Sequence, residues 1–250
     1  MTARTATRIS IKTLISLAVL SVCAFAQRGV FIAQNISAAS SVHTFTIGTN
    51  KCLNQGNAET TAIDCTLSAA PTSANFVVVG ILSQPSSCIT GVADLSGNTY
   101  TKTTNSPSST NDATAGTSQI YYRQPTGTEN TTIRATLSGT CIIAIRATVF
   151  NISPSAGTVI DVDAPAGSGT TGTTINTPTI TSPTTGALLY CFAASENAIT
   201  AVGSGWTEDP NGHASGFGED AEYNLSASGT KAASFTQSSG HWDSNCASFR

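Results

Sequence analysis

Charged side chains are scarce in this sequence of 250 residues. Asp, Glu, Lys and Arg make up 10% of the chain, whereas about a quarter of an average globular sequence is charged. The surface must therefore be covered mainly by Ser, Thr, Asn and Gly, a composition suited to short β-strands and turns outside the cytoplasm. Because apolar strand-like runs recur along the chain, the composition does not predict disorder.

Basic residues are rarest in the C-terminal part. Residues 152–250 hold nine acids against Lys231 and Arg250, whereas residues 27–151 hold six basic and five acidic side chains. A protein that binds a nucleic-acid backbone needs a basic footprint. The sequence therefore argues against a nucleic-acid partner.

Long apolar runs are also missing, so no segment predicts a comfortable transmembrane span. The N-terminus has the three parts of a secretory signal: Arg4, Arg8 and Lys12, then the mainly apolar run 14–22, then the small-x-small site 24–26. This pattern predicts a signal peptide over residues 1–26. A lipoprotein signal ending at Cys23 is a weaker alternative, because Val22 stands where a small residue is wanted. We expect an exported chain, secreted, at the cell surface or in the periplasm, with no membrane span after cleavage.

Cys-x-x-Cys pairs are absent, and His43, His213 and His241 are scattered, which disfavours a zinc site. After cleavage the chain keeps an even number of cysteines, namely Cys52, Cys65, Cys88, Cys141, Cys191 and Cys246. An even number in an exported chain predicts disulfides.

Helical periodicity is absent after the leader, and short runs alternate with Gly, Ser, Pro and Asn clusters. The nearly pure apolar runs 75–82 and 187–194 predict central strands buried on both faces. Each run opens a similar succession of later strands. We therefore predict one all-β, jelly-roll-like β-sandwich of about 12–14 strands over residues 27–250, with pseudo-repeats at about 28–151 and 152–250. Two tandem immunoglobulin-like sandwiches are the alternative.

The repeat also predicts how the cysteines pair. Cys191 and Cys246 match the apolar positions Val79 and Ala147 of the first half, on runs that we expect to be neighbours. Cys52 and Cys65 flank a polar loop that a disulfide would close. Cys88 and Cys141 then remain to pair with each other. The predicted map is Cys52–Cys65, Cys88–Cys141 and Cys191–Cys246.

The stretch ADLSGNTYTKT, residues 93–103, resembles a metal loop only superficially. Calcium takes about six or more oxygens, and its best-known loop places several acids before the glycine. Here Gly97 follows only Asp94, and Gly-Asn is typical of a tight hairpin turn. We predict a turn in which Asp94 accepts backbone N–H bonds.

A resemblance to a known family rests on such turn and core residues. The runs GVADLSGNTYT and SQIYYR, with DVDAP, TGALLYCFAAS and CASFR in the second half, resemble a widespread β-sandwich domain family of secreted and surface bacterial proteins. The resemblance implies the fold and the compartment. It carries over no catalytic residue, because the family has no assigned activity, and the six cysteines are not part of its pattern.

Paired carboxylates are the one enzymatic signal. In GEDAEYNL, the residues Ala221, Tyr223 and Leu225 predict a buried face, so Asp220 and Glu222 are expected to point into solvent together. Two such acids on one strand are found in the active sites of glycan-cleaving enzymes, but a solvated strand face is the favoured interpretation, ahead of a cation or ligand site. No residue is assigned a catalytic role.

The same segment offers a weak calcium site. Its five carboxylates, with no Lys or Arg among them, belong to Glu208, Asp209, Glu219, Asp220 and Glu222. Such a cluster repels itself unless salt screens it or a cation bridges it. Calcium is the only cofactor that the sequence suggests, and a solvated loop is the simpler interpretation.

Aromatic side chains offer a carbohydrate-binding alternative. Tyr121, Trp206 and Trp242, with Tyr100, can stack on sugars if they are exposed together, although packing explains Tyr100 and Trp206 as well. The sequence thus predicts a secreted, non-catalytic surface, adhesive or matrix-interaction module that binds an extracellular glycan or a surface protein. A carbohydrate-binding module and a glycan-cleaving enzyme are the alternatives.

Overall fold

All regular secondary structure in the described residues is β-strand. The computed structural model describes residues 43–59, 61–84, 88–104, 116–155, 160–163, 167–181, 183–213 and 218–250. The predicted leader, 1–26, with its Cys23, lies outside them. Within these ranges no helix is long and apolar enough to cross a membrane.

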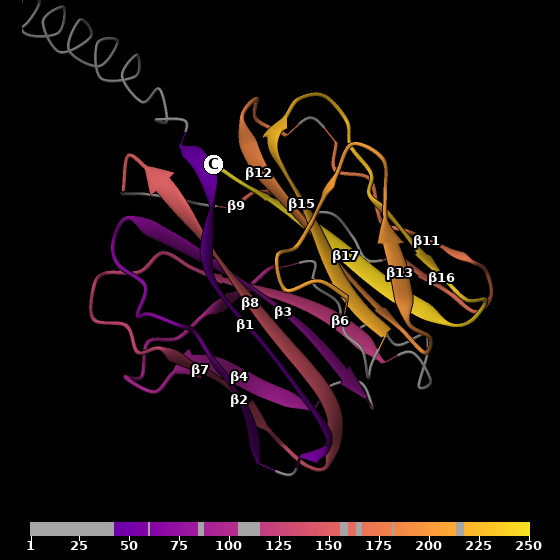
Figure 1. The fold of residues 1–250 in the computed structure, drawn as a ribbon, viewed down its shortest axis with the longest axis horizontal. Helices are drawn as coiled ribbons and strands as arrows, with labels where there is room; N and C mark the ends of the chain where they lie inside the picture. The colour runs from indigo at the N-terminus through magenta and orange to yellow at the C-terminus, as the bar shows by residue number, and fades with distance from the viewer. Residues whose placement is uncertain are drawn as a thin grey trace, which may run out of the picture. The chain divides into compact units, whose positions relative to one another are not determined.

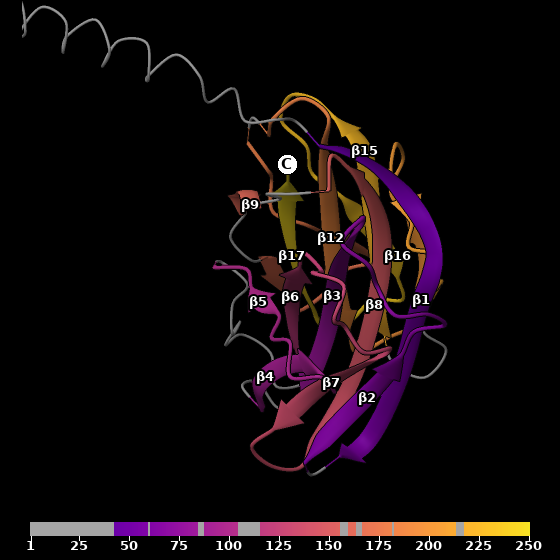
Figure 2. The same cartoon turned by 90° about the vertical axis from the view of Figure 1, so that its left-hand side faces the viewer.

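The N-terminal half contains two sheets, which we call sheets A and B. Sheet A has the order β1 (Thr44–Glu59), β8 (Cys141–Ser153), β3 (Asn75–Gln84), β6 (Thr117–Arg123) and β5 (Thr101–Lys102). Sheet B has the order β2 (Ala62–Thr66), β7 (Thr132–Leu137) and β4 (Ile89–Asp94). All pairs are antiparallel, and Figure 2 shows the long strands of sheet A side by side.

The C-terminal half contains sheets C and D. Sheet C has the order β10 (Gly167–Gly169), β17 (Trp242–Phe249), β12 (Ala187–Ser195), β15 (Gly218–Ala227) and β14 (Thr207–Glu208), and β9 (Ile160–Asp163) also pairs with β17. Sheet D has the order β11 (Thr174–Asn176), β16 (Ser234–Gln237) and β13 (Ile199–Val202). The sheets stack in the order B, A, C, D, as Figure 1 shows.

The all-β class and the sandwich architecture are confirmed. The described residues form 17 strands rather than 12–14, and the difference arises from short strands such as β5, β10 and β14 that have no apolar run of their own. Val42–Arg250 form one compact unit.

Three apolar cores fill the spaces between the four layers, and the two-residue period of the strands assigns side chains to them. In β3, Val77 and Val79 join the core between sheets A and B, while Val78 faces sheet C. In β12, Phe192 faces sheet A, while Leu189 joins the core between sheets C and D. Both strands are therefore buried on both faces, as their apolar runs predicted.

The central core holds a very close contact. A Cβ atom on Gly80 of β3 would lie 2.5 Å from a ring carbon of Phe192 in β12. Any larger residue at position 80 would collide with this ring. Gly80 therefore lets the two central sheets approach across the aromatic core.

The two halves share details as well as strand order. β4 and β13 each have a register shift, at Thr90 and at Thr200. The two hydroxyls donate to the carbonyl oxygens of Thr136 (3.1 Å) and Thr236 (3.3 Å). The turn that follows each strand contains a left-handed glycine, Gly97 or Gly205.

All six cysteines form the three predicted disulfides. The Cα–Cα distances are 5.6 Å for Cys52–Cys65, 6.5 Å for Cys88–Cys141 and 4.1 Å for Cys191–Cys246. The first two disulfides join sheet B, or the residue that precedes it, to sheet A. The third joins directly paired residues of β12 and β17.

The stretch 93–103 forms the predicted turn. The Asp94 carboxylate accepts the backbone N–H groups of Ser96 and Asn98 (both 2.9 Å) and of Asn130 (2.7 Å). Gly97 has φ 87°, the left-handed conformation that favours glycine. Burial alone would raise the pKa of Asp94, but the hydrogen bonds from Asn98, Asn130 and Ser96 lower it below 3.8.

We predict that the disulfide Cys191–Cys246 contributes more to the free energy of unfolding than the disulfide Cys52–Cys65. Cys191 and Cys246 are 55 residues apart and Cys52 and Cys65 are 13 apart. Chain entropy then gives about 4 and about 3 kcal/mol. Denaturant unfolding of the Cys191→Ala/Cys246→Ala and Cys52→Ala/Cys65→Ala variants measures both values. A larger loss from the second variant would contradict this ranking, and a peptide that links Cys88 to Cys191 or Cys246 in non-reducing mapping would overturn the map.

A second prediction concerns acid stability. Because the folded-state pKa of Asp94 is lowered, its ionised form stabilises the fold above about pH 3.8, and this contribution is lost as the pH falls further. Asp94→Asn should reduce the free energy of unfolding by roughly 1–3 kcal/mol near neutral pH. The difference from the native chain should shrink below about pH 3.8, when measured by urea unfolding across pH. Ser96→Ala, at an exposed position in the same turn, is the control, and a pH-independent difference for Asp94→Asn would refute the assignment.

Candidate functional site

A single arginine interrupts the apolar strand β8, and the main polar cluster of the molecule forms around it. β8 reads CIIAIRATVFNIS, and its odd-numbered residues from Ile143 to Val149 join the core between sheets A and B. Arg146 points the other way, towards sheet C, and has 0% exposure. A buried guanidinium needs partners for its charge and for its N–H groups.

The C-terminal half supplies those partners. The Arg146 Nε donates to Glu219 Oε2 at 2.6 Å, and a terminal nitrogen donates to Asp220 Oδ1 at 3.0 Å. Asp209 Oδ1 lies 3.7 Å from the same nitrogen. The other terminal nitrogen donates to the carbonyl oxygens of Gly212 and Glu219. Among the described residues, all recorded hydrogen bonds and ion pairs of this side chain are therefore with the other half of the molecule.

Three buried carboxylates surround one guanidinium, so the charges do not balance. The nearby carboxylates raise the pKa of Arg146, although burial alone would lower it, and the guanidinium stays charged. Burial raises the pKa of Glu219, Arg146 lowers it in part, and repulsion from Asp220 and Asp209 adds to the rise. The cluster thus holds excess negative charge or a proton.

The segment from Asp209 to Gly212 is a tight turn that places His213. The Asp209 Oδ1 accepts the backbone N–H of Asn211 at 2.9 Å, and its carbonyl oxygen accepts that of Gly212 at 2.8 Å. Gly212 has φ 68°. Thr148 of β8 and Tyr190 of β12 donate to the other Asp209 oxygen. A buried acid thus anchors the turn that presents an exposed histidine.

His213 lies between two carboxylates at the edge of sheet C. Its Nδ1 is 2.7 Å from Asp220 Oδ2 and 3.4 Å from Glu208 Oε1. One donor atom from each of the three residues lies within 4.8 Å of the other two. This group, which we call the Glu208–His213–Asp220 triad, can hold a proton or a metal ion.

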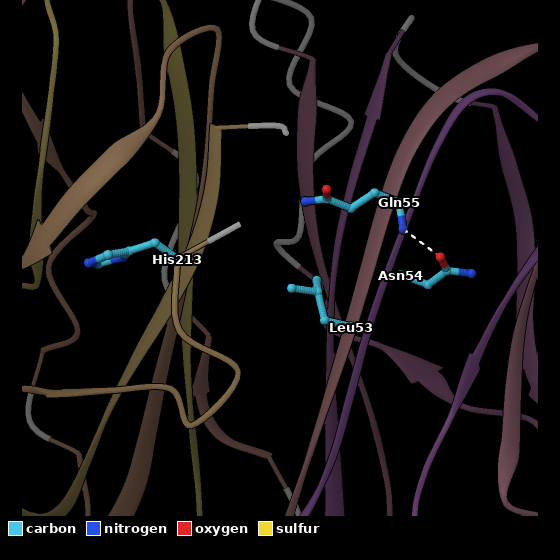
Figure 3. Close-up of a pocket in the computed structure, with 4 residues that line it drawn as sticks. All are labelled: Leu53, Asn54, Gln55 and His213. Atoms are coloured by element: carbon cyan, nitrogen blue, oxygen red, sulfur yellow. Dashed lines mark hydrogen bonds between the residues drawn. The ribbon is translucent and has the colours of Figure 1, made fainter. Parts of the chain in front are cut away.

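A cleft of about 360 Å³ adjoins the triad and is lined by Leu53, Asn54, Gln55 and His213. Figure 3 shows the Gln55 side chain extending into the space between β1 and the His213 segment, while the imidazole points away from the three β1 residues. The Gln55 Nε2 is buried, and no hydrogen-bond partner exists for it among the described residues. The cleft therefore lies between β1 of the first half and the His213 segment of the second half.

The predicted exposure of Asp220 and Glu222 was wrong. The two residues share a face of β15 in its pairing with β12, but both have 0% exposure, because sheet D covers Glu222 and the Asp220 carboxylate contacts Arg146 and His213. Glu222 accepts the backbone N–H groups of Gly203 (2.9 Å) and Ser234 (3.0 Å). Burial raises the pKa of Glu222 to about 8, although these bonds lower it. The partners that bury the two acids could not be inferred from the strand itself.

The solvated-loop interpretation of the five acids was wrong too. Asp209, Glu219, Asp220 and Glu222 are all buried, and only Glu208 is partly exposed. The cation that compensates three of them is Arg146. Calcium binding by the five acids stays a prediction. Glu222 differs from the other four acids because its hydrogen bonds are to the backbone of Gly203 and Ser234.

The aromatic candidates do not form an exposed platform. Tyr121 is 5% exposed and Trp242 9% exposed, and both belong to the apolar cores. Tyr100 is buried at 6%. Trp206 is partly buried, packs on the core between sheets C and D, and donates its indole N–H to the Ala232 carbonyl oxygen at 3.1 Å. The joint exposure that stacking on a sugar requires is therefore not met by Tyr121 and Trp242.

Two residues of the cluster were missed in the sequence. Arg146 carried a usable signal, because an unpaired charge inside a strand with apolar residues on both sides predicts a buried partner. His213 had no signal of its own. Its position depends on the turn at 209–212 and on the pairing of β14 with β15, both of which follow from the tertiary structure.

Comparison of the chain with profiles of protein families, with characterised proteins and with solved structures finds no match. The resemblance to a family of bacterial surface sandwiches stays a prediction.

We predict that Arg146 is the most costly charge in the molecule to remove. Arg146→Met leaves three buried carboxylates without their cation and should cost about 3–5 kcal/mol of the free energy of unfolding. The matched control is Arg134→Met, which breaks the exposed pair with Asp64 at 2.7 Å and should change the free energy of unfolding little, because water screens the pair. Denaturant unfolding compares the two variants. Equal losses would show that the cluster does not hold the halves together.

Proposed function

We propose that the chain is an exported, non-catalytic surface, adhesive or matrix-interaction module. The observation that carries this proposal is the bonding of the cluster: the acids that suggested chemistry are held by Arg146, Thr148 and backbone N–H groups as parts of the scaffold. Three disulfides support an oxidising compartment. A stapled, stacked sandwich is a rigid framework suited to exposure outside a cell.

The outer faces of sheets B and D support a binding role. Their exposed positions carry hydroxyl side chains in both halves, namely Thr66, Thr90 and Thr136 on sheet B and Thr174, Thr200 and Thr236 on sheet D. Apart from the Arg134–Asp64 ion pair on sheet B, whose charges cancel, these hydroxyl side chains form hydrogen bonds without long-range charge steering. They fit a glycan or a surface protein as partner.

We also propose that the halves arose by duplication. The same strand order, the same bulged threonine at Thr90 and Thr200, and the same left-handed glycine at Gly97 and Gly205 support this origin. Duplication accounts for a fold in which one sandwich packs on a second one of the same kind.

A glycan-cleaving enzyme remains the second candidate because of one observation. Burial raises the pKa of Glu222 to about 8, and Asp220 contributes to the rise. A carboxyl group that stays protonated near neutral pH can act as a general acid. Both oxygens of Glu222 are engaged by backbone N–H groups, however, which favours a structural role.

The proposal predicts binding without turnover. The full chain, produced in a host that exports it, should appear outside the cytoplasm with no free thiol. It should bind immobilised surface or matrix proteins saturably and leave glycans intact in a turnover assay. Saturable binding on a glycan array alone would favour a carbohydrate-binding module. A cytoplasmic, reduced product would contradict the proposal.

The enzyme alternative is tested on the same material. Asp220→Asn/Glu222→Gln and the control Asp64→Asn, which alters an exposed acid, are compared for glycan turnover. Turnover that the first variant loses and the control keeps would replace the module proposal with an enzyme.

A further inference from the structure

The Glu208–His213–Asp220 triad has the donors and the spacing of a metal site. The Nδ1 of His213 lies 2.7 Å and 3.4 Å from oxygens of Asp220 and Glu208. Zinc binds nitrogen and carboxylate oxygen at about 2.0–2.2 Å in a tetrahedron, so neighbouring ligand atoms are roughly 3.3 Å apart. The His213–Glu208 spacing matches this value, the His213–Asp220 spacing is about 0.6 Å shorter, and all three donor atoms lie within 4.8 Å of one another. No change of fold is needed.

The charge of the surroundings favours a second cation. Arg146 is the one guanidinium in contact with Asp209, Glu219 and Asp220, all of which have 0–1% exposure. The Glu219 Oε1 is buried, and within the described ranges it has no hydrogen-bond partner. This atom is an independent sign that Arg146 does not satisfy the carboxylates around it. A metal ion shared by His213 and the Oδ2 atom of Asp220, which does not bond to Arg146, would add the missing positive charge.

The rest of the cluster positions the triad for coordination. Arg146 holds Asp220 Oδ1 at 3.0 Å, so that Oδ2 faces His213. Hydrogen bonds from outer residues to a ligating carboxylate fix its orientation. The Asp209 turn fixes the backbone before His213. Two of the three candidate ligands are thus oriented by groups that do not bind the ion themselves.

We propose that Glu208, His213 and Asp220 bind one divalent transition-metal ion, zinc in the first place, with an open coordination position. Imidazole nitrogen is a ligand for zinc, copper and nickel, whereas calcium and magnesium take oxygen. The site is distinct from the five-carboxylate calcium set, because Asp209 and Glu222 use their oxygens for Thr148, Asn211, Gly203 and Ser234. The side chains of His213 and Glu208 are partly exposed, which leaves room for water as a further ligand. The inference is independent of the adhesive role.

A binding titration tests the site. The oxidised full chain is stripped with a chelator and titrated with zinc chloride by calorimetry, with calcium chloride in parallel. We expect one zinc ion per chain and no saturable calcium binding. His213→Ala and Glu208→Gln should each weaken zinc binding by at least about tenfold, since even outer-sphere changes cost metal sites 10–100-fold. His241→Ala is the control and should bind zinc as the native chain does.

Two further readouts keep the test decisive. The side chains of His213 and Glu208 are 32% and 39% exposed, so both metal-free variants should unfold near the native midpoint, and Glu208→Gln alone suffices if His213→Ala fails to fold. X-ray absorption of the zinc form should show nitrogen and oxygen neighbours at about 2.0–2.2 Å and no sulfur at about 2.3 Å. The proposal is overturned by an absence of zinc binding, by sulfur ligation, by equal binding in the triad variants, or by an equal loss in His241→Ala. Under those results the contact between His213 and Asp220 is only a hydrogen bond.

Discussion

The buried guanidinium of Arg146 is the constraint on which the assembly of the four layers depends. The apolar faces of sheets A and C attract each other without directional preference, so they do not by themselves define one alignment. Arg146 must reach Glu219 and Asp220 at 2.6 Å and 3.0 Å, since an unpartnered charge in this position would be prohibitively costly. We infer that this ion cluster sets the register of one sandwich on the other.

A reciprocal contact lies on the other side of the aromatic core. Val79 pairs with Ala147 and Tyr121, and Cys191 pairs with Cys246 and Glu222. On that register Arg146 corresponds to Asn245, and Glu219 corresponds to Ser118. Asn245 Nδ2 donates to Ser118 at 2.9 Å, as Arg146 donates to Glu219. The corresponding residues Gly80 and Phe192 meet between the two contacts. The interface therefore has the self-complementary character of a two-fold dimer, with an ion pair at one position and a neutral hydrogen bond at the other.

Local sequence patterns predicted much of the fold. Apolar runs identified β3 and β12, and their alignment identified Cys191 and Cys246 as cross-strand partners. The turn at Asp94 followed from its glycine. The candidate site was predicted poorly, because alternation along β15 shows that Asp220 and Glu222 share a face but not that both are buried, Glu222 beside sheet D and Asp220 against Arg146. Arg146 and the acids are 63 to 74 residues apart in sequence, so their contact depends on the packing of whole sheets. The acidic excess of residues 152–250 is partly explained by a cation from the other half.

The arrangement of Arg146 has a consequence for the time course of biosynthesis. A ribosome completes β8 well before it reaches β15, so the first sandwich is made with its lysine-poor apolar face uncovered and its arginine without counter-ions. Domains usually begin to fold from the N-terminus as they are synthesised, and exposed apolar sheets are prone to aggregation. Until sheet C arrives, the guanidinium of Arg146 is hydrated on this uncovered face. It loses that water only when Glu219 and Asp220 replace it, so we expect docking of the second half to be a late step that commits the chain to one alignment.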